Sequence, residues 1–145
     1  MNNPRIEFLK SQIGKPIENF RSPLGNWLNG TLISVSEEEI VISFKIRKEM
    51  TNPLGILHGG AAAAIMDDIM GASVFALNKE YIYVTTNLNV DFLDNAKEGE
   101  IIYAKTKVIR NGKTLINVEC QIQNNGGKIL VKGSSNLVAT QLKSL

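Results

Sequence analysis

The sequence predicts an α+β fold in which a curved antiparallel β-sheet wraps around one long central α-helix. One apolar stretch, residues 59–77, has the length of a long helix and carries apolar residues on every face. Such a helix is normally enclosed by other elements, because it could not stand alone in water. After it, apolar and polar residues alternate with the period of two that is typical of strands, near residues 81–92, 100–110, 114–124 and 128–139.

Residues 1–30 are expected to form an N-terminal leader that packs on the main domain, residues 31–145. All four prolines lie at or before Pro53, and proline disfavours a central strand. Apolar residues between positions 6 and 13 have the spacing of a short amphipathic helix. A further turn is expected at residues 17–20.

Two strands are expected after the leader, at residues 31–35 and 40–46, joined by an acidic turn. The four strands after the long helix are expected to form a meander, with hairpins at residues 110–113 and 124–127. Both hairpins contain Asn-Gly, which is typical of a type I′ turn. An open sheet leaves an edge strand, and pairing two copies edge to edge removes it, so we expect a homodimer.

The composition places the chain among ordinary globular domains. Its 145 residues carry a net charge of +2 and are 43% hydrophobic, so one domain with its own core is expected. The charges give no strong field for a polyanion, so we expect no nucleic-acid partner. With one cysteine, Cys120, and one histidine, His58, neither an intrachain disulfide nor a zinc cluster can form. A reducing cytoplasm is then the simplest compartment.

The apolar stretch approaches membrane-spanning length, but two acids interrupt it. Asp67 and Asp68 lie at its middle, where each would cost about 2.5–3.5 kcal/mol in a membrane. We therefore expect a buried helix and no membrane partner. The N-terminus lacks the apolar core of a signal segment, so secretion is not expected.

A loop that begins at Asn52 leads through His58, Gly59 and Gly60 into the long helix. In one interpretation, the glycines are a flexible helix entry and His58 is a capping residue or a satisfied core histidine. In the other, the glycines expose backbone N–H groups at the positive end of the helix dipole, where they can hold an oxyanion. A side chain would block that approach, which is why glycine suits these positions.

Asp67 and Asp68 form the second candidate for chemistry. A buried, unpaired carboxylate costs several kcal/mol, so something must compensate it. The structural interpretation is solvation at a cleft or a hydrogen bond to Thr85, Thr86 or Asn87. The functional interpretation is a general base or a nucleophile. Neighbouring helical positions diverge by about 100°, so at most one of the two acids faces a given pocket.

Spacing limits how these candidates can work together. Gly59 and Asp67 are eight residues apart, which is about 12 Å along a helix at about 1.5 Å per residue. From one helix they cannot both touch one reacting carbon. If both serve one site, the helix N-terminus of one copy must meet the mid-helix acid of another across a two-fold axis.

The chain resembles the hotdog-fold acyl-CoA thioesterases of the phenylacetate-degradation type, within the 4-hydroxybenzoyl-CoA thioesterase superfamily. The resemblance covers about residues 31–140 and is carried by Asn52, His58-Gly59-Gly60, Asp67 and residues 84–90. It implies a hotdog fold and hydrolysis of an acyl-CoA substrate to free acid and CoA. It implies no metal and no cofactor. The expected assembly is a homodimer, with a homotetramer formed from two dimers as a further option.

The resemblance also assigns roles. The Gly59 N–H would hold the reacting carbonyl with help from the Asn52 side chain, and His58 would lie beside the departing sulfur. Asp67 of the other subunit would activate water or attack directly, and the two routes remain open. Thr85 would orient the water. The comparison selects Asp67 over its neighbouring acid.

The substrate-binding residues are expected to include Gly60, Arg110 and Lys113. The two basic residues flank an Asn-Gly turn, where relatives place cations near the CoA nucleotide, and such groups suit phosphates. The alternative is that both are solvated charges at a hairpin tip.

Several apolar residues have both a structural and a functional interpretation. Met66, Met70 and Phe75 could line an acyl channel or be plain core. Trp27 and Leu28 could cover the acyl pocket or only pack.

Two other functions remain open on the same scaffold. One is a non-catalytic acyl-CoA binding or sensing protein, because fold does not determine function. The other is a hydratase, which would need a histidine acting together with a carboxylate on an enoyl thioester.

Overall fold

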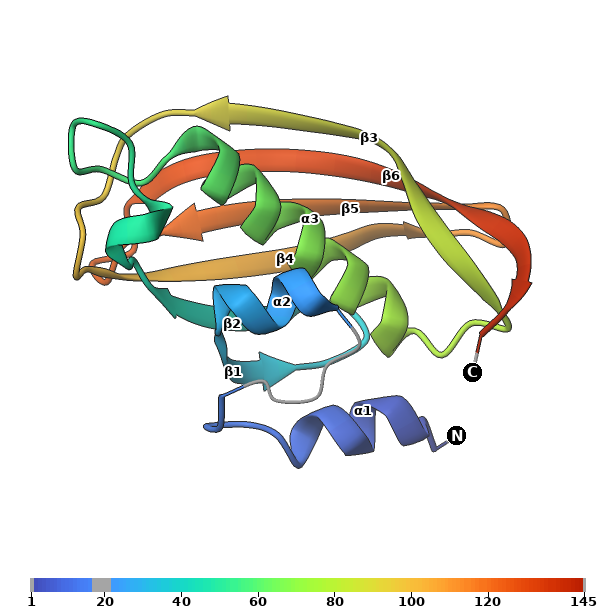
Figure 1. The fold of residues 1–145 in the computed structure, drawn as a ribbon. Coiled ribbons are helices and arrows are strands. Elements are labelled where there is room, and N and C mark those ends of the chain that lie inside the picture. Colours follow the sequence, from blue (N-terminus) through green and yellow to red (C-terminus); the bar gives the residue numbers. More distant parts are fainter. Residues whose placement is uncertain (1, 17–21, 145) are drawn as a thin grey trace.

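The computed structural model describes residues 2–16 and 22–144, so the turn expected at residues 17–20 lies outside the described residues. Two short helices precede the sheet, and one long helix interrupts it (Figure 1). The helices are α1 (Pro4–Lys10), α2 (Pro23–Leu28), the 3₁₀-helix η1 (Lys48–Met50) and α3 (Gly59–Ala76). The strands are β1 (Thr31–Val35), β2 (Ile40–Lys45), β3 (Tyr81–Phe92), β4 (Ile101–Asn111), β5 (Leu115–Gln123) and β6 (Ile129–Lys143).

All six strands form one antiparallel sheet in the order β1-β2-β4-β5-β6-β3. The sheet curves, and α3 packs against its concave face (Figure 1). The predicted fold class, the six predicted strand segments and the long helix are therefore confirmed. Strand β3 occupies one edge of the sheet.

The prediction of a four-strand meander is wrong for its first strand. Strands β4, β5 and β6 follow one another in the sheet, but β3 pairs with β6 and β4 pairs with β2. The connection between β3 and β4 is a long one, residues 93–100, that runs past the loop before α3, where the Leu57 N–H donates to the Ala96 carbonyl at 2.8 Å. A connection of this length can cross the end of the sheet, whereas a tight hairpin cannot.

Both predicted hairpins are present, but the type I′ assignment is wrong. Neither Asn111 nor Gly112 has a positive φ, and the same holds for the second Asn-Gly pair. In the second hairpin, the Gly127 N–H donates to the Asn124 carbonyl at 3.0 Å, and Gly127 itself is left-handed with φ +84°. Both loops are longer than the two residues of a type I′ turn, and in the second hairpin the left-handed Gly127 follows the turn, as is common in longer hairpin loops.

Helix α3 is enclosed on only part of its circumference. One face packs into the core through residues that include the fully buried Met66 and Met70. The opposite face, from Asp67 to Phe75, is exposed or half-buried. The helix has the length and hydropathy of a membrane-crossing segment, and half of it is buried inside the fold. The expectation of enclosure on every face is therefore wrong, because the leader and the edge strand leave the Asp67 face open.

The leader docks on the C-terminal end of α3. The Asn3 amide donates to the Ala76 carbonyl at 2.8 Å. The Arg5 guanidinium donates to the Phe75 carbonyl at 3.1 Å and stacks 4.5 Å from the centre of the Phe75 ring. Cations and amide donors at this end satisfy carbonyls that have no partner within the helix. The apolar side of α1 adds Ile6 to the core.

Candidate functional site

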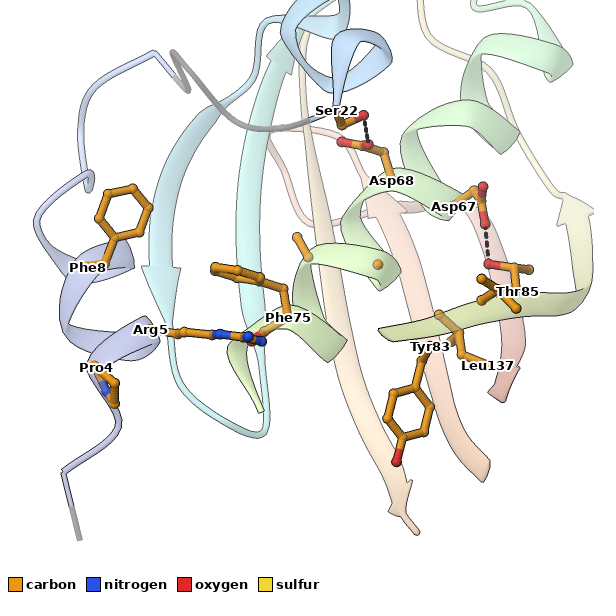
Figure 2. A pocket seen from close by; sticks show the side chains of 13 residues that line it. Pro4, Arg5, Phe8, Ser22, Asp67, Asp68, Phe75, Tyr83, Thr85 and Leu137 are labelled. Carbon is orange, nitrogen blue, oxygen red and sulfur yellow. Dashed lines mark hydrogen bonds between the residues drawn. The ribbon is translucent and has the colours of Figure 1, made fainter. Parts of the chain in front are cut away.

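Asp67 and Thr85 meet across the open face of α3. The Thr85 hydroxyl donates to Asp67 Oδ1 at 2.9 Å, and both residues are exposed (Figure 2). Thr85 faces the helix because it pairs with the buried Leu137 of β6. The register shifts at Thr86 immediately afterwards, and irregularities of this kind are common where a strand directs side chains into a site.

Asp68 has a different environment from its neighbour. The Ser22 hydroxyl, at the start of α2, donates to Asp68 Oδ1 at 2.8 Å. Burial raises the pKa of Asp68 above its usual range, the Ser22 hydrogen bond lowers it, and the Asp67 charge raises it. A Cβ at Gly25 would lie 2.7 Å from Asp68 Oδ2, so glycine is what lets α2 approach this carboxyl group. Asp68 thus ties the leader to α3, and Asp67 remains accessible.

The Asp67–Thr85 pair lies on the wall of an elongated cavity of about 760 Å³ (Figure 2). Its floor is the open face of α3, one side is β3 and the other side is α1. The lining residues are Pro4, Arg5, Phe8, Ser22, Asp67, Asp68, Gly71, Ala72, Phe75, Tyr83, Val84, Thr85 and Leu137. We call this space the Asp67 cavity. Asp67 and Asp68 both line this cavity, so the expectation that at most one of the two acids faces a given pocket is wrong, because the cavity covers more of the helix circumference than the about 100° between neighbouring positions. A mostly apolar space with polar groups at one part of its wall is suited to an apolar group attached to a reactive polar one.

The N-terminus of α3 presents a free backbone donor at Gly59. His58 caps the helix, and its Nδ1 accepts the Gly60 N–H at 2.8 Å, so the Gly60 amide is committed and the capping interpretation of His58 is confirmed. Because Nδ1 accepts, a neutral His58 ring carries its hydrogen on Nε2. The Gly59 N–H has no acceptor among the described residues.

Asn52 stands beside this free amide. Its Oδ1 accepts the Leu54 N–H at 2.9 Å and holds its own loop, which leaves the side-chain NH₂ without a partner among residues 2–16 and 22–144. Asn52, Gly59 and the half-exposed Phe92 together line a second cavity of about 350 Å³. Two N–H donors therefore reach one small space, as an oxyanion site requires.

Within one chain, the structure does not bring the donors at the N-terminus of α3 together with the Asp67–Thr85 pair. Gly59 and Asp67 line different cavities, as the helical spacing predicts. Gly60 and His58 line neither cavity, and neither do Arg110 and Lys113, which are exposed in the β4–β5 hairpin. The predicted roles of these four residues stay predictions.

The hairpin that carries the two basic residues is nevertheless tied to the Asp67 cavity. The hydroxyl of Tyr83, which lines that cavity, donates to the Lys113 carbonyl at 2.6 Å. The hairpin therefore stands at the rim of the cavity.

Other candidates have structural roles. Met66 and Met70 are core residues, whereas Phe75 lines the Asp67 cavity. In the leader, Leu28 is buried, and the Trp27 ring lies 4.9 Å from the Arg47 guanidinium, so neither covers the cavity. Burial raises the pKa of the Cys120 thiol to about 12, which keeps it protonated and unreactive.

The leader residues that line the cavity were not found from the sequence. Arg5 and Phe8 belong to a seven-residue helix whose apolar pattern indicates only that it packs somewhere. Within the described ranges, no three His, Cys, Asp or Glu side chains are placed to hold a metal ion.

Comparison with known proteins agrees with this geometry. The family description "Thioesterase superfamily" matches residues 54–131, the segment that carries Gly59, Asp67 and Thr85. The chain belongs to the thioesterase superfamily. Human acyl-coenzyme A thioesterase 13 is 30% identical over 116 residues, which cover 79% of this chain and 81% of that protein.

Two solved structures extend the comparison to the fold. Mouse thioesterase superfamily member 2 is 26% identical, with a TM-score of 0.72 and 92% of each chain covered. The Escherichia coli PaaI protein, from the phenylacetic acid degradation operon, is 19% identical, with a TM-score of 0.78, and the match covers 85% of this chain and 88% of that one. The hotdog architecture and the resemblance to thioesterases are therefore confirmed.

Proposed function

We propose that this member of the thioesterase superfamily hydrolyses acyl-CoA thioesters to the free acid and CoA. The observation that carries the proposal is the exposed Asp67–Thr85 pair on the wall of an apolar cavity. A human relative at 30% identity is named an acyl-coenzyme A thioesterase. An acyl group fits the apolar cavity, and the polar pair stands where its thioester carbon would lie.

The geometry supports a route in which water attacks the thioester carbon. The Thr85 hydroxyl donates its hydrogen to Asp67, so its oxygen can accept a hydrogen from water and position it. Asp67 takes the proton of that water as the new C–O bond forms. The C–S bond then breaks, and the thiolate receives a proton. Direct attack by Asp67 is the other route, and it forms an anhydride that water must cleave.

The oxyanion that forms during attack needs donors, and within one chain the described residues place no free backbone N–H beside Asp67. The free Gly59 N–H and the Asn52 side-chain NH₂ are such donors, and they lie in the other cavity. A second copy of the chain supplies them if its helix N-terminus faces Asp67 across a two-fold axis. His58 Nε2–H of that copy then stands near the departing sulfur.

Strand β3 is the edge through which two copies would pair. It is twelve residues long, and its exposed apolar side chains include Ile82 and Val84, which are 41% and 47% exposed. Proteins normally avoid a long, uncovered apolar edge strand. Antiparallel pairing of β3 with the same strand of a second copy would cover this edge and complete both sites. We expect a homodimer in solution, and a measured mass distinguishes it from a tetramer of two dimers.

The CoA portion would extend from the cavity mouth toward cationic groups. Arg110 and Lys113 are exposed on the hairpin that Tyr83 ties to the rim of the Asp67 cavity, and their charges suit phosphates. With the single cysteine buried, we also propose that the protein works in a reducing cytoplasm.

A thiol-release assay with short, long and aromatic acyl-CoAs tests the proposal. We expect turnover of at least one class. Binding of acyl-CoA without release of thiol from any substrate would favour the alternative, a non-catalytic acyl-CoA binding protein. Hydration of an enoyl-CoA without release of thiol would favour the hydratase alternative.

A further inference from the structure

The Asp67 cavity runs along one face of α3. Asp67, Gly71 and Phe75 follow one another at intervals of four residues, so they lie in a row on the helix surface. From Asp67 to Phe75 the helix rises about 12 Å, at about 1.5 Å per residue. The reactive pair therefore stands at one part of an elongated space, and an aromatic ring stands about two helical turns away (Figure 2).

Gly71 keeps the middle of this space open. A Cβ at Gly71 would meet no atom within 4 Å, so packing within the chain does not require glycine here. Glycine in a helix interior is less stable than alanine. The space above Gly71 is part of the Asp67 cavity, and a side chain at this position would fill it.

The leader closes the far part of the cavity. Asn3 and Arg5 bind the carbonyls of the last two residues of α3, and this contact holds α1 beside Phe75. In that position, Phe8 lines the cavity and keeps half of its side chain exposed. The Arg5 guanidinium binds the Phe75 carbonyl and stacks on the Phe75 ring. The Phe8 and Phe75 side chains form the apolar part of this wall.

We infer that α1 forms the end wall of the acyl-binding cavity and that Phe8 sets the longest acyl chain the enzyme accepts. This inference rests on the proposed thioesterase function. An all-trans alkyl chain advances about 1.3 Å per carbon, because its C–C bonds of about 1.5 Å follow a zigzag. The distance from Asp67 to Phe75 thus holds about nine carbons, so straight medium-chain acyl-CoAs are the substrate class.

The test measures kcat/KM for straight-chain acyl-CoAs of increasing length, with the intact protein and three variants. Phe8→Ala opens the end wall, and Gly71→Leu fills the middle of the cavity. Trp27→Ala is the matched control, because Trp27 is also a leader aromatic, is 46% exposed against 50% for Phe8, and does not line the cavity. Circular dichroism and melting temperature verify that each variant folds.

One methylene group gained or lost in a hydrophobic pocket changes kcat/KM by about 10- to 200-fold, which sets the size of the expected effect. The native protein should lose activity sharply beyond about ten carbons, as the cavity length implies. Phe8→Ala should raise kcat/KM for longer chains at least about tenfold relative to shorter ones, and Gly71→Leu should lower the limit. The Trp27→Ala profile should superimpose on the native profile.

Two results separate the inference from the function it rests on. If the native protein hydrolyses acyl-CoAs but Phe8→Ala, folded as the native protein is, keeps the native chain-length profile, the end-wall assignment is wrong and the thioesterase function stands. If the native protein hydrolyses no acyl-CoA of any length, the proposed function itself fails.

Discussion

Replacing Asp67 by asparagine removes the charge of the proposed base and almost nothing else. Asp67 is exposed, and among residues 2–16 and 22–144 its side chain has one hydrogen bond, from Thr85 at 2.9 Å, which the asparagine carbonyl oxygen can still accept. Surface substitutions of this kind change the free energy of unfolding by about 0.5 kcal/mol or less. Loss of a general base lowers the rate by about 10²–10⁴-fold. Activity and stability should therefore separate cleanly in Asp67→Asn.

The assay is steady-state thiol release from the best acyl-CoA, together with thermal unfolding of the same preparation. We expect a fall in kcat of at least about 100-fold with an unchanged melting temperature. Asp68→Asn is the matched control, because it makes the same chemical change one position along the same helix, at a residue bonded to Ser22. Asp67→Asn with native turnover, or an equal loss in both variants, would refute the assignment of Asp67.

Three further predictions follow from the same contacts. Because burial raises the pKa of Asp68 above its ordinary value of 3.8, the folded state binds its proton more tightly than the unfolded state, and stability is lost as pH rises through that range. Asp68→Asn removes this loss, so its melting temperature should exceed that of the native protein at pH 7 and the difference should vanish near pH 3.5. A second prediction concerns a mixture of Asp67→Ala with the double variant Asn52→Ala and Gly59→Ala. After subunit exchange, half of the dimers contain one of each variant and have one complete site of two, so the mixture should recover about a quarter of native activity. No recovery after verified exchange would contradict a shared site. Gly59→Ala adds a methyl group 3.3 Å from the Phe92 ring, beside the free amide, so kcat/KM should fall at least about tenfold. Because alanine favours a helix more than glycine does, stability should rise by up to about 1 kcal/mol. Kinetics and melting curves of the same variant measure the two effects.

The sequence predicted the elements well because each depends on a pattern inside its own segment. The apolar stretch that becomes α3 and the period-two segments that become β3 to β6 are placed within a few residues of where they fold. The meander was wrong because the order of strands depends on the route of a connection, and residues 93–100 carry no local signal for crossing the sheet.

The site was predictable in part. Sequence spacing placed Gly59 and Asp67 too far apart to act from one helix, and the two line separate cavities. The choice between Asp67 and Asp68 could not be made from residue chemistry alone. In the fold, both acids line the same cavity and each accepts a hydrogen bond from a hydroxyl group. The Ser22 hydrogen bond ties the partly buried Asp68 to the leader, whereas Asp67 is exposed and is bound by Thr85 of β3.

By itself, the sequence determined which segments form helix and strands and that the chain has one apolar core, because side-chain periodicity and composition act over short distances. Only the tertiary structure decided that β3 lies at the sheet edge and that Gly71 lines the Asp67 cavity. The tertiary structure also decided that α1 packs at the C-terminal end of α3 and places Phe8 in that cavity. These features depend on contacts between segments such as Arg5 and Phe75, which lie 70 residues apart. Nothing in either segment specifies its partner until the core brings them together.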